Sequence, residues 1–164
     1  MSGTGFAFAP AATPAFVGPV KTRAGFQYWY LACFPDCLIA VRQGALTGLL
    51  LGLSGPIPRA RFAGLGYLTM AFLMKRGNAK RRQVEADLPN IPTSRLRMEP
   101  NLVFEVAQLR SIAIKGGEFA GVVIPDLILE TTDGSQHKFG IPPKELPSVS
   151  TQLQKIYPAL YKLR

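Results

Sequence analysis

The sequence has few of the residues that build metal and redox sites. Its 164 residues include two cysteines, Cys33 and Cys37, and one histidine, His137. A structural zinc site takes four cysteine or histidine ligands, so we expect no bound metal. The two cysteines are predicted to be structural thiols at a hairpin, with a disulfide or a metal role left open. His137 is predicted to be a structural or exposed side chain, because no nucleophile or carboxylate motif accompanies it.

Acidic residues are also scarce, and they are scattered singly. The ten Asp and Glu form no pair suited to general acid–base work, and no G-x-S-x-G nucleophile motif is present. The glycine-rich stretch IKGGEFAG, residues 114–121, lacks the order G-x-x-x-x-G-K-[ST] of a phosphate-binding loop, so a loop between strands is predicted there. The chain is therefore expected to be non-enzymatic and to need no cofactor.

Negative charge is missing altogether from one long interval. No acidic residue lies between Asp36 and Glu85, whereas eight basic residues do: Arg42, Arg59, Arg61, Lys75, Arg76, Lys80, Arg81 and Arg82. This interval supplies most of the net charge of +9. Such an excess predicts an anionic partner, either a membrane surface or a nucleic acid. The alternation of aromatic and basic residues that marks an RNA-recognition sheet is absent, which disfavours nucleic acid.

What the chain does contain is a series of short β-rich runs. The runs that predict strands are 26–34, 37–43, 102–106, 109–115, 122–132 and 135–141. Pro35 and Asp36 predict a hairpin turn between the first two runs, and Asp133 and Gly134 predict another between the last two. Pro125 predicts that its strand lies at a sheet edge or carries a bulge.

The C-terminal segment has a different period. Five apolar residues recur there every three or four positions: Leu146, Val149, Leu153, Ile156 and Leu160. This spacing predicts one face of an amphipathic helix. Pro147 suits the first turn of that helix, and Pro158 is expected to kink or end it.

The first β-rich run carries three neighbouring aromatic residues. Alternation on a strand sends Trp29 to one face and both Tyr28 and Tyr30 to the other. Trp29 is predicted to lie in the core, with an interfacial aromatic belt as the alternative.

An apolar, glycine-spaced insertion interrupts the strands at residues 44–74. Pro56 and Pro58 separate its first half, GALTGLLLGLSG, from its second half, FAGLGYLTMAFLM. Each half has about 13 residues, which is short of the roughly 20 that span a membrane, so we expect two short helices at the membrane interface. Glycines at every fourth position would let another helix approach closely. Burial against the protein's own sheet, or in a soluble protein–protein interface, remains the alternative.

Two sets of residues form the candidate site. The set expected to contact the membrane or another helix is Gly44, Gly48, Leu49, Leu50, Gly52, Gly55, Phe62, Tyr67 and Phe72. The set expected to bind anionic lipid is Arg59, Arg61, Lys75, Arg76, Lys80, Arg81 and Arg82. An apolar segment that ends in Lys and Arg is typical of the cytoplasmic side of a membrane. Each basic residue near an anionic surface adds about 1 kcal/mol of attraction.

The chain is expected to form one domain with appendages. Residues 1–20 are predicted to be a disordered or partner-docking arm, since prolines and small residues break them. Residues 21–164 are predicted to form a single domain, interrupted by the insertion at 44–74 and by a basic, polar linker at 75–100. The predicted class is mainly β (α+β), with a curved antiparallel sheet or barrel of six to seven strands and a closing C-terminal helix.

This order of elements resembles the pleckstrin-homology-like (PH-like) fold. The resemblance lies in the segments YLACFPDCLIAVRQG, GLLLGLSG, VFEVAQLRSIAIKGG and LILETTDGSQHKFGI, followed by the terminal helix. More narrowly, the chain resembles small bacterial and archaeal proteins of this fold with a glycine-rich apolar insertion after the first hairpin. The resemblance implies a non-enzymatic domain that sits at membranes or in assemblies. Lipid-binding members hold phosphoinositide headgroups with basic residues in the first hairpin loop, and the loop here, residues 34–36, has none.

Together these features predict a peripheral or monotopic protein at the cytoplasmic face of a membrane, acting as an adaptor or accessory subunit. Its partners would be anionic lipids, a membrane-protein complex, or both. The alternative is a soluble structural subunit of a large assembly, with the insertion buried at an interface. A third hypothesis is RNA binding through the basic linker.

Overall fold

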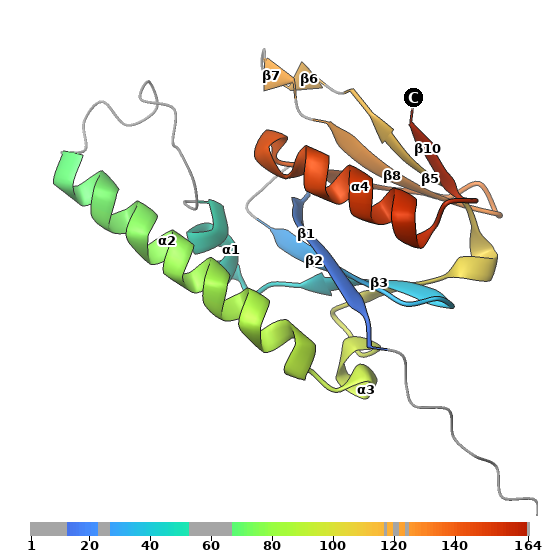
Figure 1. Cartoon of the computed structure of the whole chain (residues 1–164), viewed down its shortest axis with the longest axis horizontal. Coiled ribbons are helices and arrows are strands. Elements are labelled where there is room, and N and C mark those ends of the chain that lie inside the picture. The colour runs from blue at the N-terminus through green and yellow to red at the C-terminus, as the bar shows by residue number, and fades with distance from the viewer. Residues whose placement is uncertain are drawn as a thin grey trace, which may run out of the picture.

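The computed structural model describes residues 13–22, 27–52, 67–116, 118–119, 122–123 and 125–163. Its main sheet has eight strands in the spatial order β10-β5-β8-β9-β1-β2-β3-β4 (Figure 1). These strands are β1 (Ala15–Lys21), β2 (Tyr28–Cys33), β3 (Cys37–Arg42), β4 (Leu102–Glu105), β5 (Leu109–Lys115), β8 (Asp126–Thr131), β9 (Gln136–Gly140) and β10 (Tyr161–Leu163). A separate small hairpin joins β6 (Glu118–Phe119) to β7 (Val122–Val123).

Four α-helices accompany the sheet in the described part of the chain. They are α1 (Ala45–Gly52), α2 (Tyr67–Asp87), α3 (Thr93–Leu96) and α4 (Leu146–Ile156). Short 3-10 turns lie at η2 (Leu88–Asn90), η3 (Val106–Gln108) and η4 (Pro143–Glu145). The predicted α+β class is confirmed, with eight strands in the main sheet rather than six to seven.

Both predicted hairpins are confirmed. β2 pairs antiparallel with β3, and β8 pairs antiparallel with β9. The second turn follows from its residues, because Gly134 has a φ of +87°, a conformation that glycine adopts without strain. The carboxylate of Asp133 closes the turn by accepting a hydrogen bond of 2.9 Å from the backbone N–H of Ser135.

The prediction for the N-terminal arm is wrong in part. Residues 15–20, which were expected to lie in that arm, belong to β1, a central strand that pairs with β2 and, at Lys21, with β9. Val17 and Val20 are fully buried. The strand was not predicted because Gly18 and Pro19 are residue types that disfavour strands. Both lie at an irregularity in the register between β1 and β2. Residues 1–12 lie outside the described residues.

The prediction for Pro125 is also wrong. Strand β8 begins at the next residue, Asp126, and lies between β5 and β9 rather than at an edge. Its pairing with both neighbours is regular next to the proline. A proline just before the first strand residue takes no N–H away from the ladder, and its carbonyl accepts a hydrogen bond of 2.7 Å from Ile141.

The second half of the insertion does not end at residue 74. Helix α2 continues through the basic cluster to Asp87, so the prediction of a polar linker is wrong for residues 75–87. Lys, Arg, Gln and Glu are good helix formers, and the buried side chains of Val84 and Leu88 tie the C-terminal end of the segment to the sheet. Residues 53–66, which contain the predicted break, lie outside the described residues.

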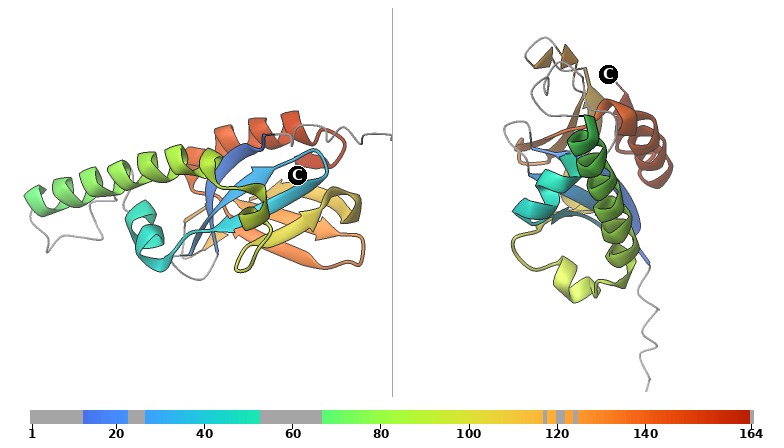
Figure 2. Two further views of the ribbon diagram at one scale, coloured as in Figure 1. Left: turned by 90° about the horizontal axis from the view of Figure 1, so that it is seen from below. Right: turned by 90° about the vertical axis from the view of Figure 1, so that its left-hand side faces the viewer.

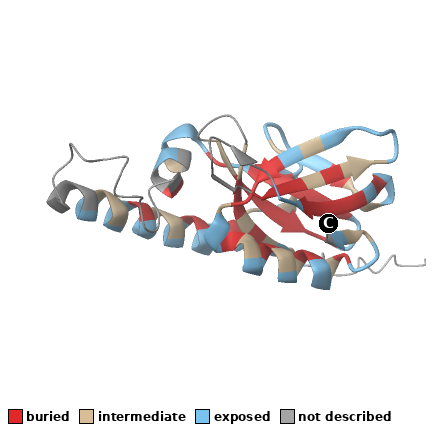
Figure 3. Cartoon of the chain, turned by 90° about the horizontal axis from the view of Figure 1, so that it is seen from above, coloured by how far each residue is buried: buried red, intermediate tan, exposed pale blue. Residues whose placement is uncertain are grey.

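Apolar side chains cover both faces of the β2–β3 hairpin. One core cluster holds Trp29 and Leu31 with Val149 and Leu153 of α4. A second cluster, on the opposite face, holds Tyr30 and Ile39 with Leu51, Val84, Leu88 and Leu96 from the α1–α3 segment. Figure 3 shows that the buried residues concentrate in the strands. The alternation predicted for Trp29 and Tyr30 and the core position of Trp29 are therefore confirmed.

The predicted C-terminal helix is confirmed as α4. Pro147 lies in its first turn, Val149 and Leu153 are buried, and Pro158 comes two residues after its last residue, Ile156. Beyond it, the hydroxyl of Tyr157 donates hydrogen bonds of 2.8 and 3.2 Å to the carbonyls of Phe34 and Cys37. These bonds tie the end of the helix to the turn of the β2–β3 hairpin.

Candidate functional site

Helices α1 and α2 form a unit that extends away from the sheet. They pack against each other, and Figure 2 shows the N-terminal half of α2 running past the edge of the sheet. At about 1.5 Å per residue, the helix is roughly 30 Å long. We call α1 together with residues 67–82 of α2 the helical arm. No helix in the described parts of the chain is both long enough and apolar enough to cross a bilayer.

Large apolar side chains of the arm face solvent. Leu46 is 73% exposed, Phe72 is 58% exposed, and Leu49 is also exposed, whereas Leu51 is buried against the sheet. Leu49 and Phe72 had been predicted to contact a membrane or another helix, and the structure leaves them uncovered. Leu46 was missed, because the sequence pattern does not show which side of α1 faces the protein.

The glycines of the predicted helix-packing set lie at or within α1 where the structure describes them. Gly44 precedes α1, and a Cβ added there would meet no atom within 4 Å, so none of the described helices packs closely on it. Gly48, Leu50 and Gly52 lie in α1, and Tyr67 is the first residue of α2. The remaining predicted residues, Gly55, Arg59, Arg61 and Phe62, lie outside the described residues.

Four of the five basic residues on α2 are available to an anion. Lys75, Arg76 and Arg82 are exposed, and Lys80 is partly exposed with a hydrogen bond of 3.2 Å to Gln83. The guanidinium of Arg76 lies 5.7 Å from the ring centroid of Phe72, a cation–π geometry. The arm therefore places basic side chains directly beside exposed apolar ones.

The fifth basic residue, Arg81, has a different role. Its guanidinium makes two bonds to the carboxylate of Glu145, at 2.6 and 3.0 Å, and a third to Glu85 at 2.7 Å. Tyr30 donates to the same Glu85 carboxylate at 3.3 Å. The hydrogen bonds that Arg81 donates to the carboxylate of Glu145 raise the pKa of Arg81 above its already high usual value. The prediction that Arg81 binds lipid is therefore not supported, since this residue fixes α2 to the 3-10 turn before α4.

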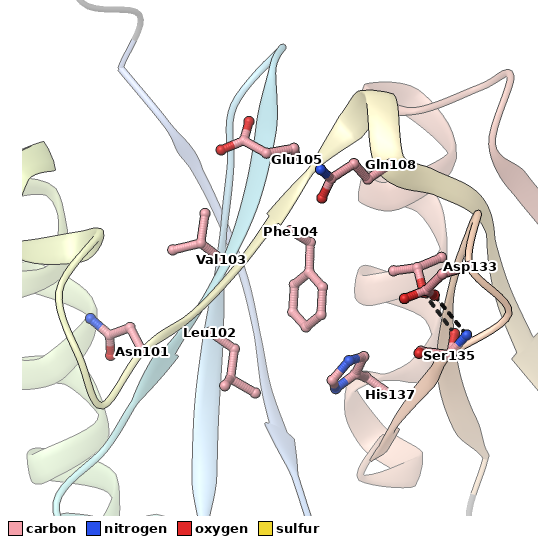
Figure 4. Close-up of a pocket in the computed structure, with 10 residues that line it drawn as sticks. Asn101, Leu102, Val103, Phe104, Glu105, Gln108, Asp133, Ser135 and His137 are labelled. Atoms are coloured by element: carbon pink, nitrogen blue, oxygen red, sulfur yellow. Dashed lines mark hydrogen bonds between the residues drawn. The ribbon is translucent and has the colours of Figure 1, made fainter.

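The structure also contains a cleft that the sequence did not indicate. It has a volume of about 290 Å³ and lies between β4 and the β8–β9 turn (Figure 4). Its lining comprises Asn101, Leu102, Val103, Phe104, Glu105, Gln108, Thr131, Asp133, Ser135 and His137. The rings of Phe104 and His137 meet edge to face, with their centroids 4.8 Å apart. No local motif could have predicted this cleft, because its two walls come from distant parts of the chain.

The rim of the cleft is acidic. Glu105 and Asp133 are the two carboxylates among its lining residues. The hydroxyl of Thr131 and the amide of Ser135 both donate to Asp133. These bonds hold the pKa of Asp133 below its usual value, with Thr131 as the largest cause, so the carboxylate stays ionised at neutral pH.

The cysteines are structural, as predicted. Both are buried and unbonded to each other, so the disulfide alternative is wrong for this structure. Burial raises the pKa of the Cys33 thiol to about 12, which keeps it protonated and unreactive. Arg97 donates to the sulfur of Cys37 at 3.2 Å. Among the described residues, no three His, Cys, Asp or Glu side chains gather as a metal site would require.

No family model, curated protein or solved structure matches this chain. Function must therefore be argued from the arm and the cleft themselves.

Proposed function

We propose that this protein is a non-enzymatic, membrane-associated adaptor or accessory subunit whose helical arm docks on the anionic cytoplasmic face of a membrane. The proposal depends on one observation: exposed apolar side chains and exposed basic side chains lie next to each other on the arm. Leu46, Leu49 and Phe72 can enter the headgroup region, and Lys75 and Arg76 can contact anionic headgroups beside them.

The arrangement of polarity along α2 supports this mode of attachment. The helix is apolar over YLTMAFLM, residues 67–74, and basic over residues 75–82, and the apolar end is the one that extends beyond the sheet (Figure 1). A shallow insertion of that end would bring the basic residues to headgroup level. With Arg81 paired to Glu145, four basic side chains remain, which together contribute about 4 kcal/mol of attraction at an anionic surface.

We further propose that the domain is PH-like, of the kind found in small bacterial proteins. The support is topological: β1 to β4 form one antiparallel meander, β5, β8 and β9 form a second, and α4 packs on the core. The arm is inserted between β3 and β4. In this arrangement the arm would hold the membrane while the rest of the domain contacts a partner.

Vesicle sedimentation tests the proposed attachment. The full chain is mixed with phosphatidylcholine vesicles that contain or lack phosphatidylserine, and the bound fraction is measured at low and high salt. We expect binding to the anionic vesicles, about tenfold or more weaker for the double variant Lys75→Glu/Arg76→Glu. Phe72→Ala should weaken the binding that survives high salt, because that part depends on apolar insertion.

The matched control is Lys138→Glu/Lys155→Glu, which changes the charge equally on exposed positions of β9 and α4. This control should bind nearly as well as the unmodified chain. Equal losses of vesicle binding in both double variants would mean that binding depends on net charge alone, which would contradict the proposed site. Failure of the unmodified chain to bind any vesicle would favour the soluble assembly subunit. Binding to RNA that falls steeply with salt would favour the third hypothesis.

A further inference from the structure

Strand β4 has an open edge beside the acidic cleft. Among the strands that the structure describes, β3 is the one that pairs with it. Val106, directly after β4, donates its N–H to Asp36 on the β3 side at 2.8 Å. Backbone groups alternate in direction along an antiparallel strand, so the N–H and C=O groups of Leu102 and Phe104 also turn toward β3. Those of Val103 and Glu105 therefore point to the open edge, where they can pair with an added strand.

The side chains around this edge are unusually apolar for a surface. Leu102 and Val103 are each 37% exposed, and Met98 just before the strand is also exposed. Together with the three on the helical arm, they are the exposed large apolar side chains of the described residues. Met98, Leu102 and Val103 belong to a different part of the chain from the arm, and Leu102 and Val103 lie on opposite faces of β4.

The cleft supplies a place for a side chain of an added strand. Leu102 and Phe104 lie on the side of β4 that faces His137, and the cleft opens between them and the β8–β9 turn (Figure 4). A strand paired to Val103 and Glu105 would direct every second side chain to that side. The volume of about 290 Å³ is enough for one apolar side chain.

The charge of the rim indicates the chemistry of the occupant. Glu105 and the ionised Asp133 make the rim acidic, and the nearby Arg97 is shared between Asp36 and Glu105 at 3.5 Å each. A Lys or Arg on the incoming segment would therefore find a carboxylate partner. A second copy of this chain is disfavoured as the occupant, because pairing two β4 edges would bring two acidic rims together.

We propose that the open edge of β4 binds an extended segment of a partner protein as an added strand. One apolar side chain of that segment fills the cleft, and a Lys or Arg lies at the rim beside Glu105 or Asp133. The inference does not depend on membrane attachment, because the edge and the arm involve different residues.

A phage-displayed library of random peptides, selected on the full chain, tests the proposal. We expect selected peptides to share alternating apolar residues and at least one Lys or Arg. Val103→Pro should weaken their binding about tenfold or more, since it removes an N–H that points outward while leaving the bonds to β3 in place. The matched control Val103→Thr keeps the N–H and the branched shape, and should bind as the unmodified chain does. Glu105→Gln should reduce the preference for basic peptides.

Amide hydrogen exchange of the full chain with a selected peptide provides a second readout that does not rely on variants. The amides of Val103 and Glu105 should exchange quickly in the free protein and become protected in the complex. The amide of Phe104, already bonded to β3, should change little. The proposal would be overturned if no peptide is selected. It would also be overturned if binding protects other amides and is unchanged in the Val103→Pro variant. Protection of Val103 and Glu105 by self-association alone would also overturn it, in favour of a second copy.

Discussion

At the scale of single residues, Arg81 shows how position decides the role of a charge. It lies in a run of basic residues and has the same chemistry as its neighbour Arg82. Of these two, Arg81 is the one that pairs with Glu145 of η4, a residue that is 7% exposed. A buried carboxylate is costly without a partner, so this pair stabilises the attachment of α2.

Replacing Arg81 should therefore destabilise the protein more than replacing Arg82. Arg81→Leu leaves Glu145 buried without its guanidinium, and we expect the free energy of unfolding to fall by about 2 kcal/mol. Arg82→Leu removes the same charge from an exposed position and should change it by less than about 0.5 kcal/mol. Urea denaturation followed by circular dichroism measures both. Equal changes in the two variants would mean that the bond to Glu145 contributes little.

At the scale of elements, the β8–β9 hairpin is the part of the fold most completely specified by its own residues. Asp133 and Ser135 close the turn, and Gly134 takes the φ of +87° that the turn requires. A Cβ at Gly134 would meet no atom within 4 Å, so the cost of a side chain there comes from the backbone conformation alone.

Gly134→Ala should therefore lower the free energy of unfolding by about 1 kcal/mol. Gly116→Ala is the matched control, because Gly116 also has open space around it and does not have a positive φ. It should be neutral or slightly stabilising, since it restricts the unfolded chain. Thermal unfolding of the two variants side by side measures the difference. Similar melting temperatures would show that the turn tolerates a side chain.

At the scale of the whole molecule, one β-hairpin contributes side chains to two hydrophobic cores. The β2–β3 hairpin is covered by α4 on one face and by the α1–α3 segment on the other. Buried thiols and phenols lie in both cores, among them Cys33, Tyr30 and Tyr157. Burial is the largest cause that raises the pKa of each of these three groups above its usual value.

Stability should consequently fall in alkaline solution. The unfolded chain releases a thiol proton near pH 9.0, whereas folded Cys33 keeps its proton up to about pH 12. The folded state thus binds more protons in that range. The contribution of the protonated Cys33 thiol to the free energy of unfolding is therefore complete below pH 9 and is lost as the pH rises toward 12. Between its unfolded and folded pKa, each such group lowers the free energy of unfolding by about 1.4 kcal/mol per pH unit.

Urea midpoints measured from neutral pH to about pH 11 test this dependence on the buried groups. In Cys33→Ala the decline should be shallower than in the unmodified chain, because one of the titrating groups is gone. A flat profile above pH 9 in the unmodified chain would contradict the prediction.

The sequence by itself determined the features whose signals are local. Turn residues predicted the β2–β3 and β8–β9 hairpins, apolar spacing predicted α4, and alternation predicted the core position of Trp29. These predictions succeed because each depends on interactions between residues that are close in the chain. The absence of acidic residues between Asp36 and Glu85 likewise marked the arm as basic.

Only the tertiary structure decided the features that depend on distant residues. It made residues 15–21 a central strand despite Gly18 and Pro19, because the neighbouring strands supply hydrogen bonds and burial. It placed Glu145 beside Arg81, so that Arg81 forms an ion pair with this carboxylate. It also left β4 at an open edge and brought Phe104 against His137, so that the cleft formed. Burial and charge pairing act across the folded chain, and the order of residues alone does not show which of them will meet.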